Sequence, residues 1–142
     1  MKVLFDTNIV LDLLLARQRF VADAQHLFAK VERNEITGHL CSTTVTTVHY
    51  LIAKNFGAKS ATNNVAKLLT LFEIAPVSRT VIEMALKSSF RDFEDAILHE
   101  SARLSGVDAI VTRNLANFAQ AQIPTYDPPT LLALLKTKPS RD

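Results

Sequence analysis

The 142-residue sequence has one cysteine, three glycines and five prolines, and it has no long apolar run. Cys41 cannot form an internal disulfide, so we expect a small buried apolar residue there. No apolar stretch reaches the ~18 residues that cross a bilayer. Asp6 and Asp12 interrupt the apolar N-terminal segment, so we expect no signal peptide and a cytoplasmic location.

Repeats, low-complexity tracts and linker-like segments are also missing from the sequence. With 48% hydrophobic residues, the chain can bury a sizeable core. We therefore expect one domain over residues 1–136 and a flexible polar tail over 137–142. The chain has no glycine-rich phosphate loop, no Gly-x-Ser-x-Gly elbow and no ligand spacing typical of zinc sites.

The net charge of +2 is too small to indicate nucleic-acid binding by itself. Basic side chains are nevertheless concentrated between residues 13 and 70. They are Arg17, Arg19, Lys30, Arg33, Lys54, Lys59 and Lys67. We expect most of them to lie on solvated helix faces, and contact with phosphate groups is the alternative role.

Short apolar runs alternate with segments of helical periodicity along the chain. We expect strands at 2–5, 38–42, 72–77, 109–112 and 123–126. We expect helices after residue 8 and at 20–34, 43–55, 59–71, 81–86, 92–106 and 128–135. Each connection is long enough for a crossover, so the pattern predicts an α/β fold with a parallel sheet and helices on both faces.

Asp6 directly follows the first predicted strand, at the edge of the sheet where open α/β folds place their sites. The alternative is a helix N-cap, because aspartate commonly begins a helix after a strand. Thr7 and Asn8 can cap the same helix or donate hydrogen bonds that fix the Asp6 carboxylate. For Asp12 we favour a solvated helix position over a place in the same cleft.

A second acidic cluster, Asp92, Glu94 and Asp95, begins a later helix. Asp92 and Asp95 are three residues apart and share one helix face. Acids in a first turn also stabilise the helix dipole, which is the structural alternative. His99 lies four residues after Asp95 and could be a ligand or a proton carrier, but we favour a surface position.

Thr112, Arg113 and Asn114 follow the fourth predicted strand, in the position that Asp6 has after the first. Thr112 offers a hydroxyl group and Asn114 an amide oxygen, while Arg113 could contact a phosphate. The alternative for Asn114 is a helix N-cap. Asp108 precedes the strand, so we expect it at the opposite edge of the sheet and exclude it from the site.

Carboxylates that folding brings together require a cation between them, or one of them stays protonated. The two acidic segments therefore predict a divalent metal site, which in turn indicates phosphodiester chemistry. The motifs Phe5-Asp6-Thr7-Asn8, Glu94-Asp95-Ala96 and the run at 108–114, with Phe118 following, resemble the PIN domain family. The resemblance covers nearly the whole chain, and it favours the bacterial branch with Asp-Phe-Glu-Asp-Ala and Val-Thr-Arg-Asn motifs.

This resemblance implies a three-layer α/β/α Rossmann-like fold with a short, mainly parallel central sheet. It also implies a Mg²⁺ or Mn²⁺ site, cleavage of single-stranded RNA and, for many small bacterial members, a toxin role with an antitoxin partner and homodimerisation. The implied catalytic residues are Asp6, Asp95 and Glu94. The implied metal ligands are Asp6, Asp95, Glu94 and Asp92, and Thr7, Asn8, Thr112 and Asn114 would orient ligands or water.

Two positions depart from the family pattern. The helix after residues 42–44 usually carries a glutamate near its middle, where this chain has His49, and an aspartate is common where it has Asn114. Fewer carboxylates weaken the binding of hard cations. The alternative is therefore a catalytically weak PIN-like module that binds RNA or protein. An acidic-site phosphatase is disfavoured because Asn8 stands where such enzymes have a second aspartate.

Overall fold

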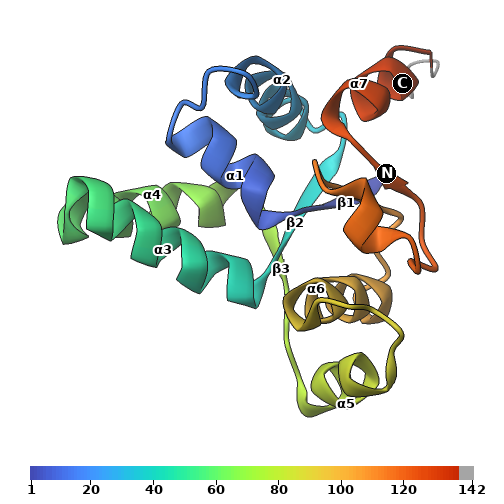
Figure 1. Cartoon of the computed structure of the whole chain (residues 1–142). Coiled ribbons are helices and arrows are strands. Elements are labelled where there is room, and N and C mark those ends of the chain that lie inside the picture. Colours follow the sequence, from blue (N-terminus) through green and yellow to red (C-terminus); the bar gives the residue numbers. More distant parts are fainter. Residues whose placement is uncertain (138–142) are drawn as a thin grey trace.

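The structure is a computed structural model, and it describes residues 1–137. Five strands form one sheet in the order β3-β2-β1-β4-β5, and every neighbouring pair is parallel (Figure 1). The strands are β1 (Lys2–Phe5), β2 (Thr37–Cys41), β3 (Glu73–Ala75), β4 (Ala109–Val111) and β5 (Thr125–Tyr126). This sheet confirms the predicted fold class.

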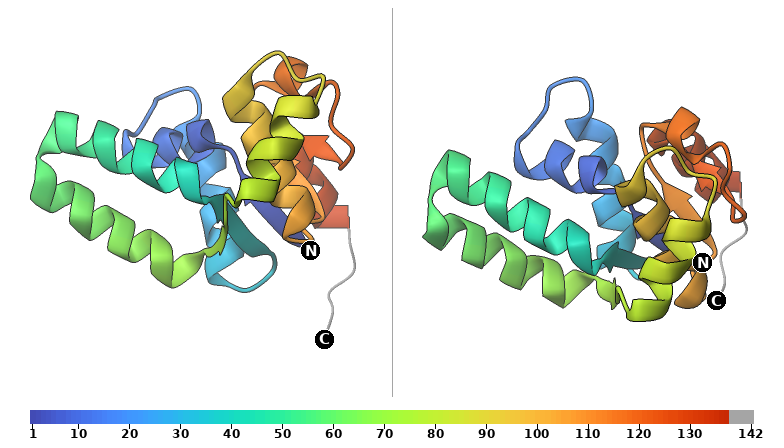
Figure 2. Two further views of the ribbon diagram at one scale, coloured as in Figure 1. Left: turned by 90° about the horizontal axis from the view of Figure 1, so that it is seen from below. Right: turned by 60° about the horizontal axis from the view of Figure 1, so that its bottom comes forward.

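Seven α-helices and one short 3₁₀ helix connect and cover the strands in the described part of the chain (Figures 1 and 2). They are α1 (Thr7–Leu14), α2 (Val21–Glu32), α3 (Ser42–Phe56), α4 (Ala58–Leu71), α5 (Arg79–Lys87), α6 (Phe93–Leu104), the 3₁₀ helix η1 (Leu115–Phe118) and α7 (Pro128–Thr137). Helices α3 and α4 form an antiparallel pair that projects beyond the sheet (Figure 2).

Alternation along the strands divides the core into two layers. Val3 and Phe5 of β1 pack with residues of α1, α2, α3, α4 and α7 on one face of the sheet. Leu4, between them, packs with residues of α5 and α6 on the other face. The rings of Phe5, Phe28 and Phe72 meet edge to face, with centroids 5.1–5.7 Å apart. The three layers are therefore helix, sheet and helix.

The order of the strands reverses at β1. The chain proceeds from β1 outward to β2 and β3, and then crosses to β4 and β5 on the other side. Such a reversal opens a crevice at the carboxyl ends of the two central strands, where open α/β sheets bind ligands. The β1–β4 boundary is thus the expected place for a site.

The expected strands and helices are all found, and most boundaries agree within a few residues. Two differences are informative. The 3₁₀ helix at 115–118 has no apolar period long enough to reveal it, and α7 continues to Thr137, which we had assigned to the tail. The rest of that tail, 138–142, lies outside the described residues, and the domain boundary at 136 stays a prediction.

Two further observations concern expectations drawn from composition. Cys41 is fully buried, as we expected. Within residues 1–137, no helix combines the length and hydropathy required to span a membrane.

Candidate functional site

Asp6 directly follows β1 and is the N-cap of α1. The two roles that the sequence suggested for it, helix cap and site residue, are therefore compatible. One carboxylate oxygen, Oδ1, accepts a 2.7 Å hydrogen bond from the Thr7 backbone N–H. The other, Oδ2, accepts from the Thr112 hydroxyl at 2.7 Å and from the Asn8 side-chain amide at 3.3 Å. Asp6 is 6% exposed. These bonds fix the orientation of a carboxylate that is nearly removed from solvent.

Thr112 reaches Asp6 because β4 lies beside β1. The Asp6 backbone N–H donates to the Val111 carbonyl at 2.9 Å, which brings the two strand ends together. The Thr112 hydroxyl oxygen also accepts from the Asn114 backbone N–H at 3.0 Å. The single hydroxyl proton is then directed at Asp6, and this hydrogen bond favours the charged form of the carboxylate.

The acidic start of α6 faces the same cavity. Asp92 caps the helix by accepting from the Asp95 backbone N–H at 3.2 Å, and Glu94 and Asp95 occupy the first turn. Asp6, Asp92, Glu94 and Asp95 all line a cavity of about 260 Å³. Its other lining residues are Thr7, Asn8, Leu11, Arg17, Thr43, Thr47, Leu98, Asn114 and Asn117.

The two innermost acids are hard to ionise together. The pKa of Asp95 is raised to about 6, first by burial and then by the negative charges of Asp6 and Asp92, although a hydrogen bond from Asn117 opposes the shift. Burial also raises the pKa of Asp6, against its hydrogen bonds from Thr112 and Thr7. Two carboxylates in this state favour a proton or a cation between them.

The donor set is compatible with a hard divalent cation. Asn8 Oδ1 is buried and has no hydrogen-bond partner among the described residues, and such an oxygen is a suitable ligand or water acceptor. Within residues 1–137, no three His, Cys, Asp or Glu side chains lie close enough to hold a metal ion by themselves. Mg²⁺ needs only one or two protein carboxylates, because water and substrate phosphate complete its shell. The site therefore fits such an ion, bound partly through solvent.

Most of the sequence-predicted site residues lie together. Thr7, Asn8 and Asn114 line the cavity with the acids, and Thr112 contacts Asp6 directly. Asp108 lies at the opposite edge, as expected, where its carboxylate accepts from the Lys2 backbone N–H. The roles assigned to these residues stay predictions.

His49 does not lie in the cavity. Its side chain is exposed on α3, whereas Thr43 and Thr47 of the same helix line the cavity. Threonines therefore occupy the part of α3 that faces the site, and His49, which stands where the family pattern has a glutamate, lies outside it. Thr43 and Thr47 are four residues apart, and this spacing could have indicated that both lie on the same face of the helix. Asn117 was also missed, because it lies in a 3₁₀ helix. Arg17, for which we had favoured a solvated helix face over a phosphate contact, lies in the loop between α1 and α2 and lines the cavity.

Asp12 is buried and not solvated, contrary to our expectation. It is 1% exposed, and both its oxygens accept from Arg113, at 2.7 Å from Nε and 3.1 Å from Nη2. The Arg113 guanidinium lies 3.8 Å from the centroid of the Phe20 ring. Arg113 is thus held inside the protein by an ion pair and a cation–π contact. These contacts occupy the guanidinium group that we had considered for a phosphate contact.

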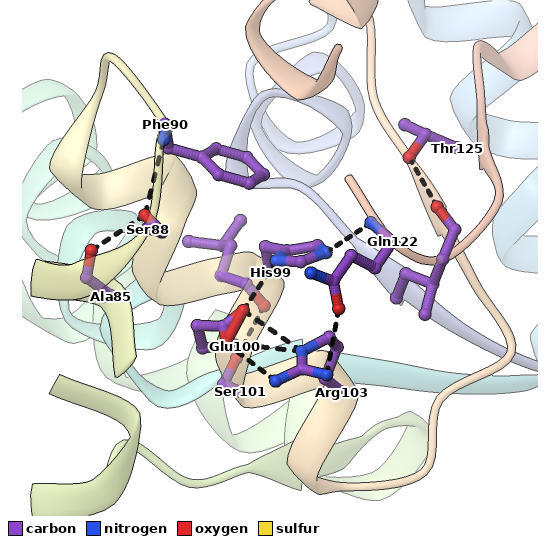
Figure 3. Close-up of polar contacts among 11 residues, drawn as sticks. Ala85, Ser88, Phe90, His99, Glu100, Ser101, Arg103, Gln122 and Thr125 are labelled. Carbon is purple, nitrogen blue, oxygen red and sulfur yellow. Dashed lines mark hydrogen bonds and ion pairs between the residues drawn. The ribbon is translucent and has the colours of Figure 1, made fainter. Parts of the chain in front are cut away.

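His99 is also buried, at 2% exposure, so the surface position that we favoured is wrong (Figure 3). Its Nε2 accepts from the Gln122 backbone N–H at 2.9 Å, which leaves the proton on Nδ1 to be donated to Glu100 at 2.7 Å. Burial lowers the pKa of His99. The Phe90 ring packs on the imidazole, with centroids 4.8 Å apart. His99 ties α6 to the loop before β5 and is not a cavity residue.

The raised pKa of Asp95 predicts that the site lowers the stability of the protein. In the unfolded chain this carboxyl loses its proton near pH 3.8, but in the folded protein it does so near pH 6. The contribution of this group to the free energy of unfolding is therefore most favourable at low pH, and it is lost as the pH rises from about 4 to about 6. After allowance for solvent screening of a partly exposed group, we expect Asp95→Asn to stabilise the metal-free protein by ~1–2 kcal/mol near neutral pH.

Urea unfolding at about pH 4 and about pH 7.5, with a chelator present, measures this difference. The gain should vanish at the lower pH, where the wild-type carboxyl is itself neutral. Glu73→Gln removes the same charge from an exposed strand residue and serves as the control. A loss of stability at both pH values would contradict the repulsion between Asp95 and its neighbours.

Comparison with known proteins identifies the family of the fold. The model of the PIN domain family matches residues 2–116. No curated protein sequence matches the chain.

Several solved structures share the fold. A toxin–antitoxin complex from Klebsiella pneumoniae is 25% identical, with a TM-score of 0.66 over 89% of this chain and 97% of that one. FitAcB from Neisseria gonorrhoeae is 19% identical, with a TM-score of 0.69 over 89% and 97%. VapC20 from Mycobacterium tuberculosis, described as a toxin that cleaves the sarcin-ricin loop, is 18% identical, with a TM-score of 0.62 over 76% and 86%. The family model covers most of this sequence and the described structure has the same fold, so the chain belongs to the PIN domain family.

Proposed function

We propose that this chain is a divalent-metal-dependent endoribonuclease that cleaves single-stranded RNA. The observation that carries the proposal is the convergence of Asp6 and Asp95 on one cavity, where burial raises the pKa of both and the charge of Asp6 further raises that of Asp95. Membership in the PIN domain family and similarity to a toxin that cleaves the sarcin-ricin loop support it. A binding protein without catalysis has no evident need for two such costly carboxylates.

In the proposed mechanism, the acidic side chains of the cavity hold the metal ion. Asp6 and Asp95, assisted by Glu94 and Asp92, would bind Mg²⁺ or Mn²⁺. When bound, the metal supplies an activated water and stabilises negative charge on the phosphate.

The neutral side chains of the cavity position the acids and water. Thr7, through its backbone N–H, and Thr112, through its hydroxyl, hold the Asp6 carboxylate in one orientation. Asn117 does the same for Asp95. Asn8 and Asn114 present polar groups to the cavity, and the unpartnered Asn8 oxygen can accept a hydrogen bond from a bound water. A preorganised arrangement of this kind needs little rearrangement when the substrate arrives.

The second candidate is a catalytically weak module that binds RNA or protein through the same cavity. Asn114 and the two α3 threonines favour it, because these neutral side chains occupy parts of the lining where additional carboxylates would strengthen metal binding. The two candidates differ in what Asp95 does. A nuclease loses metal affinity and turnover in an Asp95→Asn variant, whereas a binding module retains its affinity for the ligand.

The proposal extends to the biological setting. Similar solved structures include a toxin–antitoxin complex and a toxin, which supports a toxin role for this chain with an antitoxin protein as its partner. The family resemblance further supports a homodimer that acts in the cytoplasm. Coexpression of the chain with a neighbouring small gene, followed by copurification, tests the partner.

Purified protein incubated with end-labelled single-stranded RNA tests the nuclease. We expect cleavage with Mn²⁺ or Mg²⁺, none after chelation by EDTA, and recovery when metal is added back, because the acids cannot perform the reaction without the cation. A duplex RNA of the same sequence tests the strand preference. Cleavage that persists at full rate in EDTA would refute the metal-dependent mechanism. Intact RNA that stays bound in every metal would favour the binding module.

A further inference from the structure

Arg17 is the single cationic side chain that lines the acid cavity in the described part of the chain. Its neighbours in the lining are acidic, neutral polar or apolar. A nucleic-acid backbone carries a negative charge at every phosphate, and a cavity with four carboxylates repels it. A cationic side chain in the lining of this cavity can therefore offset the repulsion and bind a backbone phosphate.

The loop between α1 and α2 holds the backbone of Arg17 firmly. The Arg17 N–H donates to the Asp12 carbonyl at 3.0 Å, and the Arg17 carbonyl accepts from Phe20 and Val21 at 2.9 and 2.8 Å. Ala16 adopts a left-handed backbone with φ 49° immediately before it. The chain thus keeps a tight turn that presents Arg17 to the cavity.

Arg17 and Arg113 contact the same carboxylate, Asp12, but not to the same extent. Arg113 binds both oxygens of Asp12 and already neutralises that carboxylate. Arg17 reaches Asp12 through only one contact, 3.3 Å from Nη1 to Oδ1, and its side chain is 37% exposed. Among residues 1–137, its other four N–H donors have no hydrogen-bond partner. Two guanidinium groups therefore share the one Asp12 carboxylate, and Arg17 is the more exposed of the two arginines.

We propose that Arg17 binds a backbone phosphate of single-stranded RNA at the edge of the acid cavity. The inference rests on the proposed nuclease function and assigns it a substrate-binding residue. The planar guanidinium group donates two parallel hydrogen bonds to phosphate oxygens, which a lysine ammonium cannot reproduce. Arg113 acts as a positioning residue: its ion pair with Asp12 fixes the carboxylate that orients Arg17.

Binding of a labelled single-stranded oligoribonucleotide by fluorescence anisotropy tests the proposal. The measurement uses the Asp6→Asn background with Mg²⁺, so that the RNA stays intact. Arg17→Gln should weaken binding about tenfold or more. It should also reduce the slope of log K against log salt by about 0.7, the value for one lost phosphate contact with a single strand. Arg17→Lys should retain most of the salt dependence and lose part of the affinity.

Arg19→Gln is the matched control, because Arg19 lies two residues away, is exposed and does not line the cavity. Thermal unfolding of each variant verifies that the loop is intact, and Arg17→Lys decides the question if Arg17→Gln unfolds. In the otherwise wild-type enzyme, Arg17→Gln should raise KM more than it lowers kcat.

Equal binding by the Arg17→Gln and Arg19→Gln variants would overturn the inference and leave Arg17 as a partner of Asp12 only. Failure of this inference can be distinguished from failure of the proposed nuclease function. If the wild type cleaves RNA but Arg17 has no effect on binding, only the inference fails. If no metal supports cleavage, the nuclease proposal fails, while the binding comparison still decides the role of Arg17.

Discussion

An Asp6→Asn variant is expected to cleave RNA about 10³-fold more slowly than the wild type at saturating metal. Metal stabilisation of the transition state is worth several kcal/mol, and each 1.36 kcal/mol corresponds to a factor of ten in rate. Asp6 is the most buried acid of the cavity, and its two oxygens are oriented by Thr7 and Thr112. The substitution removes the negative charge of the carboxylate to which Thr7 and Thr112 donate hydrogen bonds.

The fold should survive this substitution. The asparagine Oδ1 can still accept from the Thr7 N–H and cap α1, since a neutral asparagine caps a helix about as well as aspartate. The new amide nitrogen cannot accept from the Thr112 hydroxyl, but removal of a buried charge eliminates the desolvation cost that raises the pKa of Asp6, and the two effects oppose one another. Circular dichroism and thermal unfolding should therefore match those of the wild type, while cleavage and metal affinity by calorimetry both fall.

Asp108→Asn provides the matched control, because it removes the same charge from the opposite edge of the sheet. Its rate of RNA cleavage should stay within about twofold of the wild type, as is usual for surface substitutions away from a site. Equal cleavage by the Asp6→Asn variant and the wild type would exclude Asp6 from the reaction and with it the proposed mechanism.

The largest effect on stability is expected from Asp12→Ala, which should lower the free energy of unfolding by about 3–5 kcal/mol. Asp12 is 1% exposed and receives three contacts from Arg17 and Arg113. Its removal leaves the Arg113 guanidinium, whose side chain is 23% exposed, without a counterion in the interior. Breaking a buried pair costs more than the pair contributes, because the remaining charge is stranded.

Urea unfolding of the Asp12→Ala variant measures this loss. Glu83→Ala is the control, because it removes an ion pair with Arg79 that is exposed on α5, and it should cost less than about 1 kcal/mol. A double variant, Asp12→Ala with Arg113→Met, should recover part of the stability, since no buried charge then remains unpaired. Equal losses for Asp12→Ala and Glu83→Ala would contradict a structural role for this ion pair.

The order of strands and helices was predictable because it depends on local periodicity, and the position of Asp6 followed from it. A buried strand that ends on a carboxylate before a helix indicates the carboxyl edge of a parallel sheet. Thr112 was predictable for the same reason, since it ends a second strand. Which of these ends are neighbours depends on the strand order, and the structure supplies that information.

The predictions for His99 and Asp12 failed because their partners are distant in the sequence. All residues from Ala96 to Ala102 in α6 are buried, so the helix has no solvated stripe for periodicity to reveal. His99 is satisfied by Gln122, and Asp12 by Arg113, 101 positions later. Arg17 and Asn117 lie in irregular segments, where neither a helical nor a strand period applies.

The β1–β4 pairing has a consequence for synthesis of the protein. Asp6 is translated more than a hundred residues before the Thr112 hydroxyl that orients it and the Asn117 amide that contacts Asp95. A nascent chain therefore cannot contain the assembled cavity until synthesis has passed Asn117. Under the nuclease proposal, the growing chain stays inert toward its message and the ribosome until that point.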